Sequence, residues 1–154
     1  MTAESLETLN LPPISPAFKT LGQKKYILDK MRRKFVIFTR EEWVRQHWVW
    51  YLVDYHRVAP SLLVVEHAFK FHEMPKRADI VVFNRAFKPG LIVECKAPDV
   101  PITEKVIQQA AIYNQVLNAP YLVVSNGIDH LLFGYDLEQK KMQPLSELPD
   151  FSSW

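Results

Sequence analysis

LIVECKAP, residues 91–98, begins as an apolar run of the kind found in buried strands and ends with a carboxylate and an ammonium two residues apart. Successive side chains of a strand point to opposite faces, so we expect Glu94 and Lys96 on one face and Cys95 on the other. Pro98 then ends the strand, because proline cannot continue a hydrogen-bonded ladder. Charged groups at the end of an apolar strand indicate either a functional site or an ion pair.

The segments on both sides of this strand predict a mixed α/β fold. Thr39, followed three residues later by Glu42, is a capping-box signature, so a helix is expected from about residue 40 to 55. A second helix is expected over 103–118, where the apolar period becomes helical. Apolar runs predict strands at 35–38, 61–71, 78–83, 91–96, 121–125 and 130–136. The order helix, three strands, helix, strand predicts a mixed β-sheet flanked by helices, with extra strands.

The preceding strand, residues 78–83, is predicted to pair with LIVECK as a hairpin. Symmetrical closure of the connection places Asp79 opposite Lys96. A small slip places Asp79 opposite Glu94 to Cys95 instead. Two carboxylates close together repel each other, and a divalent cation removes that repulsion; oxygen ligands suit a hard ion such as Mg²⁺. From the residues alone, the alternative is a cross-strand ion-pair cluster at a sheet edge.

Several segments make the context more specific. They are TREEWVRQHWVWYL (39–52), KRADIVVF (76–83), LIVECKAPDVPIT (91–103), IQQAAIYNQ (107–115) and YLVVSNGIDH (121–130). Together they resemble the PD-(D/E)xK nuclease superfamily, in its form with a Q-x-x-x-Y extension. The resemblance is closer to the N-terminal nuclease domain of the R (restriction) subunits of type I restriction enzymes, and it covers roughly residues 25–136. It implies a restriction-endonuclease-like αβββαβ core, the same order that periodicity predicts.

The resemblance also implies an activity, the Mg²⁺-dependent hydrolysis of DNA phosphodiester bonds, with Mn²⁺ as a substitute ion. Asp79 and Glu94 match the positions that hold the metal, with the Cys95 backbone carbonyl as a further ligand. Lys96 matches the lysine that orients or polarises the attacking water and offsets charge in the transition state. We therefore expect a metal-dependent endodeoxyribonuclease.

Two positions on the second helix and one on the first complete the implied site. Gln109 and Tyr113 match the Q-x-x-x-Y element, and their spacing of four puts them on one helical face. The alternative is that both are polar helix residues that hydrogen-bond to the sheet. The first helix of such nucleases often supplies another carboxylate, for which Glu42 is the candidate, although the capping box explains Glu42 equally well.

A basic stretch precedes the first predicted helix. Residues 19–40 carry eight of the nineteen lysines and arginines and a single acid. The densest piece, DKMRRKF (29–35), is expected to contact DNA phosphates, and its candidate residues are Lys30, Arg32, Arg33 and Lys34. A solvated polar face is the alternative, because most charge runs are of that kind.

Length and composition indicate one folded domain. The chain has 154 residues, of which 48% are hydrophobic, enough for a sizeable core. We expect an extended arm over 1–20, a PD-(D/E)xK nuclease-like domain over 21–145 and a C-terminal tail over 146–154. A single cysteine excludes an internal disulfide, the longest apolar run is too short to cross a bilayer, and the start lacks a secretory signal. These features predict a cytoplasmic protein without a membrane partner.

The sequence contains no GxxxxGK[ST] phosphate loop, so we expect a restriction-type nuclease domain without a motor, acting alone or with partners. DNA is the expected partner, with a second copy in a homodimer or other restriction-system subunits. One alternative is a catalytically silent DNA-binding or complex-assembly module of a restriction or defence system, against which the intact set Asp79, Glu94 and Lys96 argues. The other is a nuclease that acts on RNA or branched nucleic acid, which no sequence feature separates from a DNA nuclease.

Overall fold

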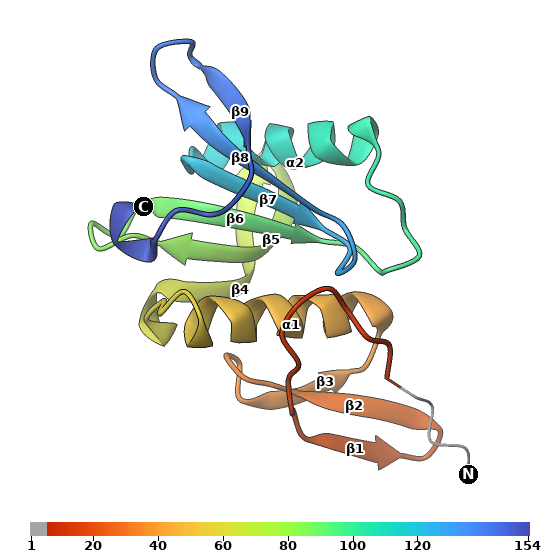
Figure 1. The fold of residues 1–154 in the computed structure, drawn as a ribbon. Helices are drawn as coiled ribbons and strands as arrows, with labels where there is room; N and C mark the ends of the chain where they lie inside the picture. The colour runs from red at the N-terminus through yellow and green to blue at the C-terminus, as the bar shows by residue number, and fades with distance from the viewer. Residues whose placement is uncertain (1–5) are drawn as a thin grey trace.

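The computed structural model describes residues 6–154, in which a three-stranded and a six-stranded β-sheet enclose one helix (Figure 1). Helix α1 (Arg40–Asp54) lies between the sheets, and α2 (Glu104–Leu117) covers the other face of the large sheet. The strands are β1 (Phe18–Leu21), β2 (Lys24–Asp29), β3 (Lys34–Ile37), β4 (Leu63–Phe71), β5 (Met74–Phe83), β6 (Pro89–Cys95), β7 (Tyr121–Ser125), β8 (His130–Asp136) and β9 (Lys141–Leu145). Two short 3₁₀ helices, η1 (Pro60–Leu62) and η2 (Phe151–Ser153), lie outside these elements.

Helix α1 begins where the capping signature predicts. The Thr39 Oγ1 accepts a hydrogen bond from the Glu42 backbone N–H at 3.0 Å. The helix is buried on most sides because it is packed between two sheets rather than on one. Ile27 of β2, Val49 of α1 and Val93 of β6 belong to one continuous core. The small sheet is therefore an integral layer of the domain.

The large sheet has the strand order β4-β5-β6-β7-β8-β9 and reproduces the predicted element order. From α1 the chain runs through β4, β5, β6, α2 and β7, so the αβββαβ core is confirmed. β6 and β7 are parallel, which requires a crossover connection, and α2 provides it. The face of the sheet under α2 holds a second core that includes Val81, Ile92, Ala110 and Leu122. β8 and β9 add two antiparallel strands at one edge.

The hairpin of β5 and β6 has a different register from the symmetrical one predicted. Ile80 pairs with Val93, so the next residues along the strands, Asp79 and Glu94, face each other. The predicted partner, Lys96, lies two residues further on. The turn closes earlier in the chain than symmetrical closure requires, and β5 carries a bulge near its end. Of the two registers considered, the slipped one is observed, and it brings two carboxylates together.

The predicted arm packs on the domain where it is described. Residues 1–5 lie outside the described part of the chain. Leu9 is buried, and the Asn10 backbone N–H donates a hydrogen bond to the Gly127 carbonyl at 2.8 Å. The predicted boundary after residue 20 falls inside β1. The arm thus contributes apolar side chains to the main core and β1 to the small sheet.

Three strands of the structure are missing from the sequence prediction, namely β1, β2 and β9. Each of them mixes lysines with apolar residues, so no continuous apolar run marks it. The predicted tail, residues 146–154, folds back so that Trp154 packs against the main core. Within residues 6–154, neither α-helix is long and apolar enough to span a membrane.

Gly127 provides a test of how firmly the arm is docked. Its φ is +86°, and a Cβ added there would lie 3.0 Å from side-chain atoms of Leu9 and Val44. We expect Gly127→Ala to lower the free energy of unfolding by about 2–3 kcal/mol, from the left-handed backbone and the overpacking together. Gly22→Ala is the matched control, because Gly22 has a φ of +61° and nothing within 4 Å of an added Cβ. In urea unfolding, Gly22→Ala should lower the free energy of unfolding by only about 1 kcal/mol. If both variants lower it by the same amount, the arm is not closely docked at Gly127.

Candidate active site

A cavity of about 180 Å³ lies where β5, β6, α1 and α2 meet. The side chains that line it are those of Glu41, Arg77, Asp79, Glu94, Lys96, Val106, Gln109, Ala110 and Tyr113. The structure therefore brings the five residues predicted as catalytic to one cavity, although their chemical roles stay predictions. Four elements contribute to it, and each is held by one of the two cores.

Asp79 is held through both of its carboxylate oxygens. Its Oδ2 accepts a hydrogen bond from the Cys95 backbone N–H at 2.8 Å. Its Oδ1 accepts one from Arg45 Nη2 at 2.9 Å. The Asp79 backbone N–H in turn donates to Glu94 Oε1 at 3.4 Å. These contacts fix the orientation of Asp79 and place the two carboxylates on neighbouring strands, facing each other.

The cavity is crowded with negative charge. Burial raises the pKa of Glu94 well above its ordinary value, and the nearby Asp79 carboxylate raises it further. Burial also raises the pKa of Glu41, again with a contribution from Asp79, while Arg45 and Lys96 act in the opposite direction. Carboxylates in such surroundings favour a proton or a cation. The electrostatics of the cavity therefore suit a positively charged ligand.

The acidic residue that helix α1 contributes to the cavity lining is Glu41, whereas the sequence-based candidate is its neighbour Glu42. Glu42 does not line the cavity, because its carboxylate is turned toward Arg32 and Arg45, at 2.7 and 2.9 Å. Adjacent helical residues point about 100° apart, so only one of the two can face the cavity. Helix spacing does not single out Glu41, because both glutamates lie within reach of Arg45, Glu41 at i,i+4 and 3.8 Å and Glu42 at i,i+3 and 2.9 Å.

Arg45 is a residue that the sequence reasoning missed. Its guanidinium contacts Glu42 as well as Asp79, and its side chain is only 10% exposed. Burial alone would lower the pKa of Arg45, but the Asp79 and Glu42 carboxylates more than offset this and raise it. Arg45 therefore stays charged and joins α1 to β5 next to the cavity.

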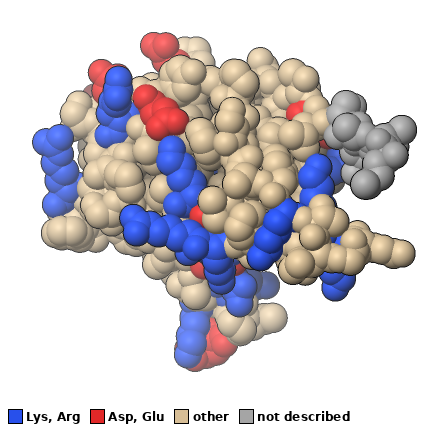
Figure 2. Space-filling model, turned by 90° about the horizontal axis from the view of Figure 1, so that it is seen from below, with Lys and Arg blue, Asp and Glu red and all other residues tan. Residues whose placement is uncertain are grey.

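The basic stretch is only partly available to a nucleic acid. The Arg32 guanidinium contacts three carboxylates, those of Asp29, Glu42 and Glu66, at 2.6–2.8 Å. These ion pairs occupy Arg32, so its predicted phosphate contact would compete with three carboxylates and stays a prediction. Lys30 is 3.3 Å from Asp54 and lies over the Trp50 ring. Arg33 and Lys34 are exposed, and Figure 2 shows lysines and arginines spread over this side of the molecule.

The remaining predicted residues fall on two sides of β6. Gln109 and Tyr113 line the cavity, and Gln109 Nε2 donates a hydrogen bond to Tyr113 Oη at 3.4 Å. Cys95 is buried in the core shared with α1, as its alternation predicts, and burial raises the pKa of its thiol. A role for the Cys95 carbonyl as a metal ligand stays a prediction.

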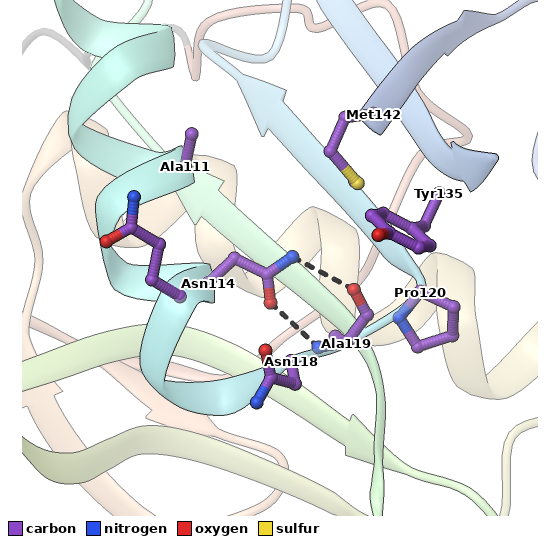
Figure 3. Close-up of a pocket in the computed structure, with 8 residues that line it drawn as sticks. Ala111, Asn114, Asn118, Ala119, Pro120, Tyr135 and Met142 are labelled. Atoms are coloured by element: carbon purple, nitrogen blue, oxygen red, sulfur yellow. Dashed lines mark hydrogen bonds between the residues drawn. The ribbon is translucent and has the colours of Figure 1, made fainter. Parts of the chain in front are cut away.

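A larger cavity, of about 420 Å³, lies at the other end of α2 (Figure 3). Its central polar group, the Asn114 amide, bonds to the backbone N–H and carbonyl of Ala119 at 2.8 and 2.9 Å. The amide thereby completes the C-terminal end of α2. The other side chains in Figure 3 include Tyr135 and Met142, and none of the lining residues is charged. This cavity lacks the groups needed for phosphodiester chemistry.

The donor set of the smaller cavity fits an ion that needs few protein ligands. Within residues 6–154, no three His, Cys, Asp or Glu side chains stand close enough together to form a metal cage. Mg²⁺ does not require one, because it commonly binds through one or two carboxylates and completes its octahedron with water and phosphate oxygens. Asp79 and Glu94, with their oxygens beside one cavity, fit that mode.

The chain was compared with known proteins. Residues 40–149, which include every cavity residue, match the family model for the type I restriction enzyme R protein N terminus (HSDR_N). The chain belongs to this family. The HSDR_N match begins at the first residue of α1 and extends beyond β9, so it takes in the αβββαβ core and both added strands. A search of curated proteins found no match.

Two solved structures are similar to this HSDR_N chain. One is a fragment of a protein assigned as an HsdR subunit of a type I restriction enzyme from Vibrio vulnificus, with 26% identity over 58% of this chain and a TM-score of 0.42. The chain spans about a fifth of that protein's length, 19%. The other is a protein from Anabaena variabilis assigned as a nuclease of the DUF820 group, with 14% identity, 93% and 87% of the two chains covered, and a TM-score of 0.46.

The crowding of carboxylates predicts a pH-dependent cost in stability. Because the folded-state pKa of Glu94 lies above 4.5, the folded protein holds this proton more tightly than the unfolded chain. The contribution of Glu94 to stability is therefore lost as pH rises from about 4.5 through the folded pKa. We expect Glu94→Gln to raise the melting temperature of the metal-free protein near neutral pH, with the gain shrinking toward about pH 4.5.

Asp79→Asn is the contrasting variant in this experiment. It removes the carboxylate that Arg45 and the Cys95 N–H both contact, so it should lower the melting temperature across the same pH range. A Glu94→Gln protein that melts below the wild type near neutral pH would contradict the assignment of Glu94 as a destabilising buried acid.

Proposed function

We propose that this HSDR_N chain is a metal-dependent endonuclease that hydrolyses DNA phosphodiester bonds. The observation that carries the proposal is that Asp79, Glu94 and Lys96 line one cavity, with the two acids facing each other on adjacent strands. Membership of the restriction R-protein family supports it independently. Catalysis itself and the identity of the metal belong to the proposal.

Asp79 and Glu94 would hold Mg²⁺, with Mn²⁺ as a substitute and the Cys95 carbonyl as a further ligand. Glu41, which lines the same cavity, is a candidate to position a water molecule. A bound divalent ion would act as a Lewis acid on the phosphate and lower the pKa of a bound water. The raised pKa values of Glu94 and Glu41 support this assignment, because burial and then the neighbouring Asp79 carboxylate raise them, and a bound cation would favour the charged form of both acids.

Lys96 would supply the positive charge that the acids do not neutralise. It follows β6 directly, lines the same cavity and acts on both Glu94 and Glu41 through its charge. In phosphodiester hydrolysis the attacking water must be positioned and the extra negative charge of the transition state offset. Gln109 and Tyr113, joined by their hydrogen bond on α2, would help to orient the water or the phosphate.

One observation favours a second candidate, a catalytically silent DNA-binding or assembly module. Asp79 already has two partners, Arg45 and the Cys95 N–H, and so has a structural role without any metal. The metal-binding proposal is compatible with these contacts, because a carboxylate has about four lone-pair sites and the two partners use only some of them. We further propose that the domain works on DNA together with other subunits of a restriction system.

The nuclease proposal predicts the behaviour of two cavity variants. Lys96→Ala and Glu94→Gln should each lower the rate of plasmid cleavage in Mg²⁺ by on the order of 100-fold or more, the scale of one charge-stabilising or acid–base group. Glu94→Gln should also weaken Mg²⁺ binding in calorimetry, whereas Lys96→Ala should not. Lys105→Ala is the control, because Lys105 is exposed at the start of α2 and does not line the cavity. If wild-type protein binds neither Mg²⁺ nor Mn²⁺ and cleaves neither plasmid nor single-stranded DNA, the nuclease proposal is contradicted and the catalytically silent module becomes the better explanation.

The adjacent acids of α1 should separate catalysis from stability. Glu41→Gln should lower the cleavage rate with little change in melting temperature, because Glu41 lines the cavity and is partly exposed. Glu42→Gln should instead destabilise the fold by on the order of 3 kcal/mol, since it uncouples Arg32 and Arg45 from their shared carboxylate. Melting curves beside plasmid assays would measure both effects. If Glu42→Gln instead lowers cleavage without destabilising the fold, Glu42 rather than Glu41 would be the acid of α1 that acts in the site.

A further inference from the structure

The small sheet has one face packed on α1 and one face that is exposed. Pairing of Phe18 with Ile27 and of Ile27 with Val36 places these three on the inner face, where all of them join the main core. Alternation then places Lys19 and Tyr26, which are paired with each other, on the outer face. The same face carries Lys24, Phe35, Leu21 and Ile37, and the last two are 58% and 54% exposed.

The small sheet carries an excess of positive charge. Residues 18–37 contain seven lysines and arginines and a single acid, Asp29, which is fully buried and paired with Arg32. Within the described residues, five of these cations have no carboxylate within ion-pair distance: Lys19, Lys24, Lys25, Arg33 and Lys34. Figure 2 looks onto this side and shows lysines and arginines crossing it. The charge suits a polyanion.

Two aromatic rings on the outer face have their flat sides turned toward a cation. The Lys19 ammonium lies 4.5 Å from the centroid of the Phe35 ring and 5.8 Å from that of Tyr26. An ammonium takes this position over a ring face, so one face of each ring is turned toward the Lys19 side chain. Aromatic rings beside lysines on a basic surface are a combination that binds single-stranded nucleic acids, with bases stacked on the rings and phosphates paired with the cations.

We propose that the outer face of β1–β3 binds single-stranded DNA. Bases stack on Tyr26 and Phe35, while the ammonium groups of Lys19 and Lys24 contact the phosphates. The choice of DNA over RNA rests on the proposed function. Helix α1 packs on the inner face of this sheet and also contributes Glu41 to the cavity, and Arg32 ties Asp29 of β2 to Glu42 of α1, so the bound strand and the cavity belong to one rigid unit.

The aromatic rings and the lysines make separate contributions, and each can be removed by itself. Binding of a short labelled single-stranded oligonucleotide is followed by fluorescence anisotropy in EDTA, so that no hydrolysis is needed. The double variant Lys19→Ala/Lys24→Ala should bind more weakly and should flatten the slope of log affinity against log salt by about 1.4, from two contacts at about 0.7 each. Lys88→Ala/Lys141→Ala is the matched control with the same charge change at exposed positions elsewhere, and it should bind like the wild type.

Tyr26→Leu and Phe35→Leu keep apolar bulk on the sheet but remove the flat rings. Each should weaken single-strand binding by about tenfold, with little effect on a duplex of the same sequence, because only unpaired bases can stack on the rings. Melting curves check that these variants are folded. If a leucine variant does not fold, the lysine pair still tests the proposal.

Three results would overturn the proposal. In the first, Lys19→Ala/Lys24→Ala binds the single strand as tightly as the control variant does, which would indicate that the exposed face contacts a protein partner instead. In the second, the leucine variants lose duplex and single-strand binding equally. In the third, RNA of the same sequence binds more tightly than DNA. The nuclease proposal can fail independently of this one. If Glu94→Gln and wild type are equally inactive in cleavage while Lys19→Ala/Lys24→Ala loses binding, the single-strand-binding proposal is supported and the nuclease proposal is contradicted.

Discussion

The ion pair between Arg45 of α1 and Asp79 of β5, 2.9 Å long, is the contact on which the candidate site depends. It fixes the helix that carries Glu41 against the hairpin that carries Glu94. The same Asp79 carboxylate accepts the Cys95 N–H and so also sets the end of β6. Breaking a buried pair of this kind costs about 3–5 kcal/mol, because the remaining charge is left without a partner. Asp79 therefore has a structural role beside the chemical one that we propose.

The Arg45 pair belongs to a longer network that joins both sheets. Arg45 shares Glu42 with Arg32, and Arg32 contacts Asp29 at the end of β2 and Glu66 of β4. Elements distant in the sequence are thereby connected through side chains of both charges. A buried network of this type adds little net stability compared with apolar residues packed in the same place. It does require that its charged groups be held in precise positions, because each unpaired group would be costly. Its effect here is to hold α1 in one position relative to the cavity.

The cavity itself works against stability. Glu94, a buried acid with a raised pKa, faces the Asp79 carboxylate across β5 and β6, and Glu41 of α1, whose pKa is also raised, lines the same cavity; a sequence selected for stability alone would place apolar residues there. Arg45 and Lys96 reduce the repulsion without removing it. Perturbed acids that gather in one cavity are typical of functional sites, although ion-pair networks can also perturb pKa values. The rest of the sheet, with apolar residues on both faces, provides the rigid support that such a site needs.

The sequence by itself determined the order of the core elements, because apolar periodicity and the Thr39 capping signal are local properties of the chain. It also indicated which strand ends carry charge, since alternation follows from backbone geometry alone. It missed β1 and β2, whose lysines interrupt the apolar pattern and whose stability comes from packing on α1.

Only the tertiary structure decided which of two adjacent glutamates faces the cavity and which hairpin register is adopted. It also decided the charge pairing of the basic stretch. Arg32 is paired with carboxylates, whereas Lys19 and Lys24 have no carboxylate partner within residues 6–154. Each of these outcomes depends on contacts between elements far apart in the chain. Such contacts fix side-chain direction and charge pairing, and no local sequence pattern encodes them.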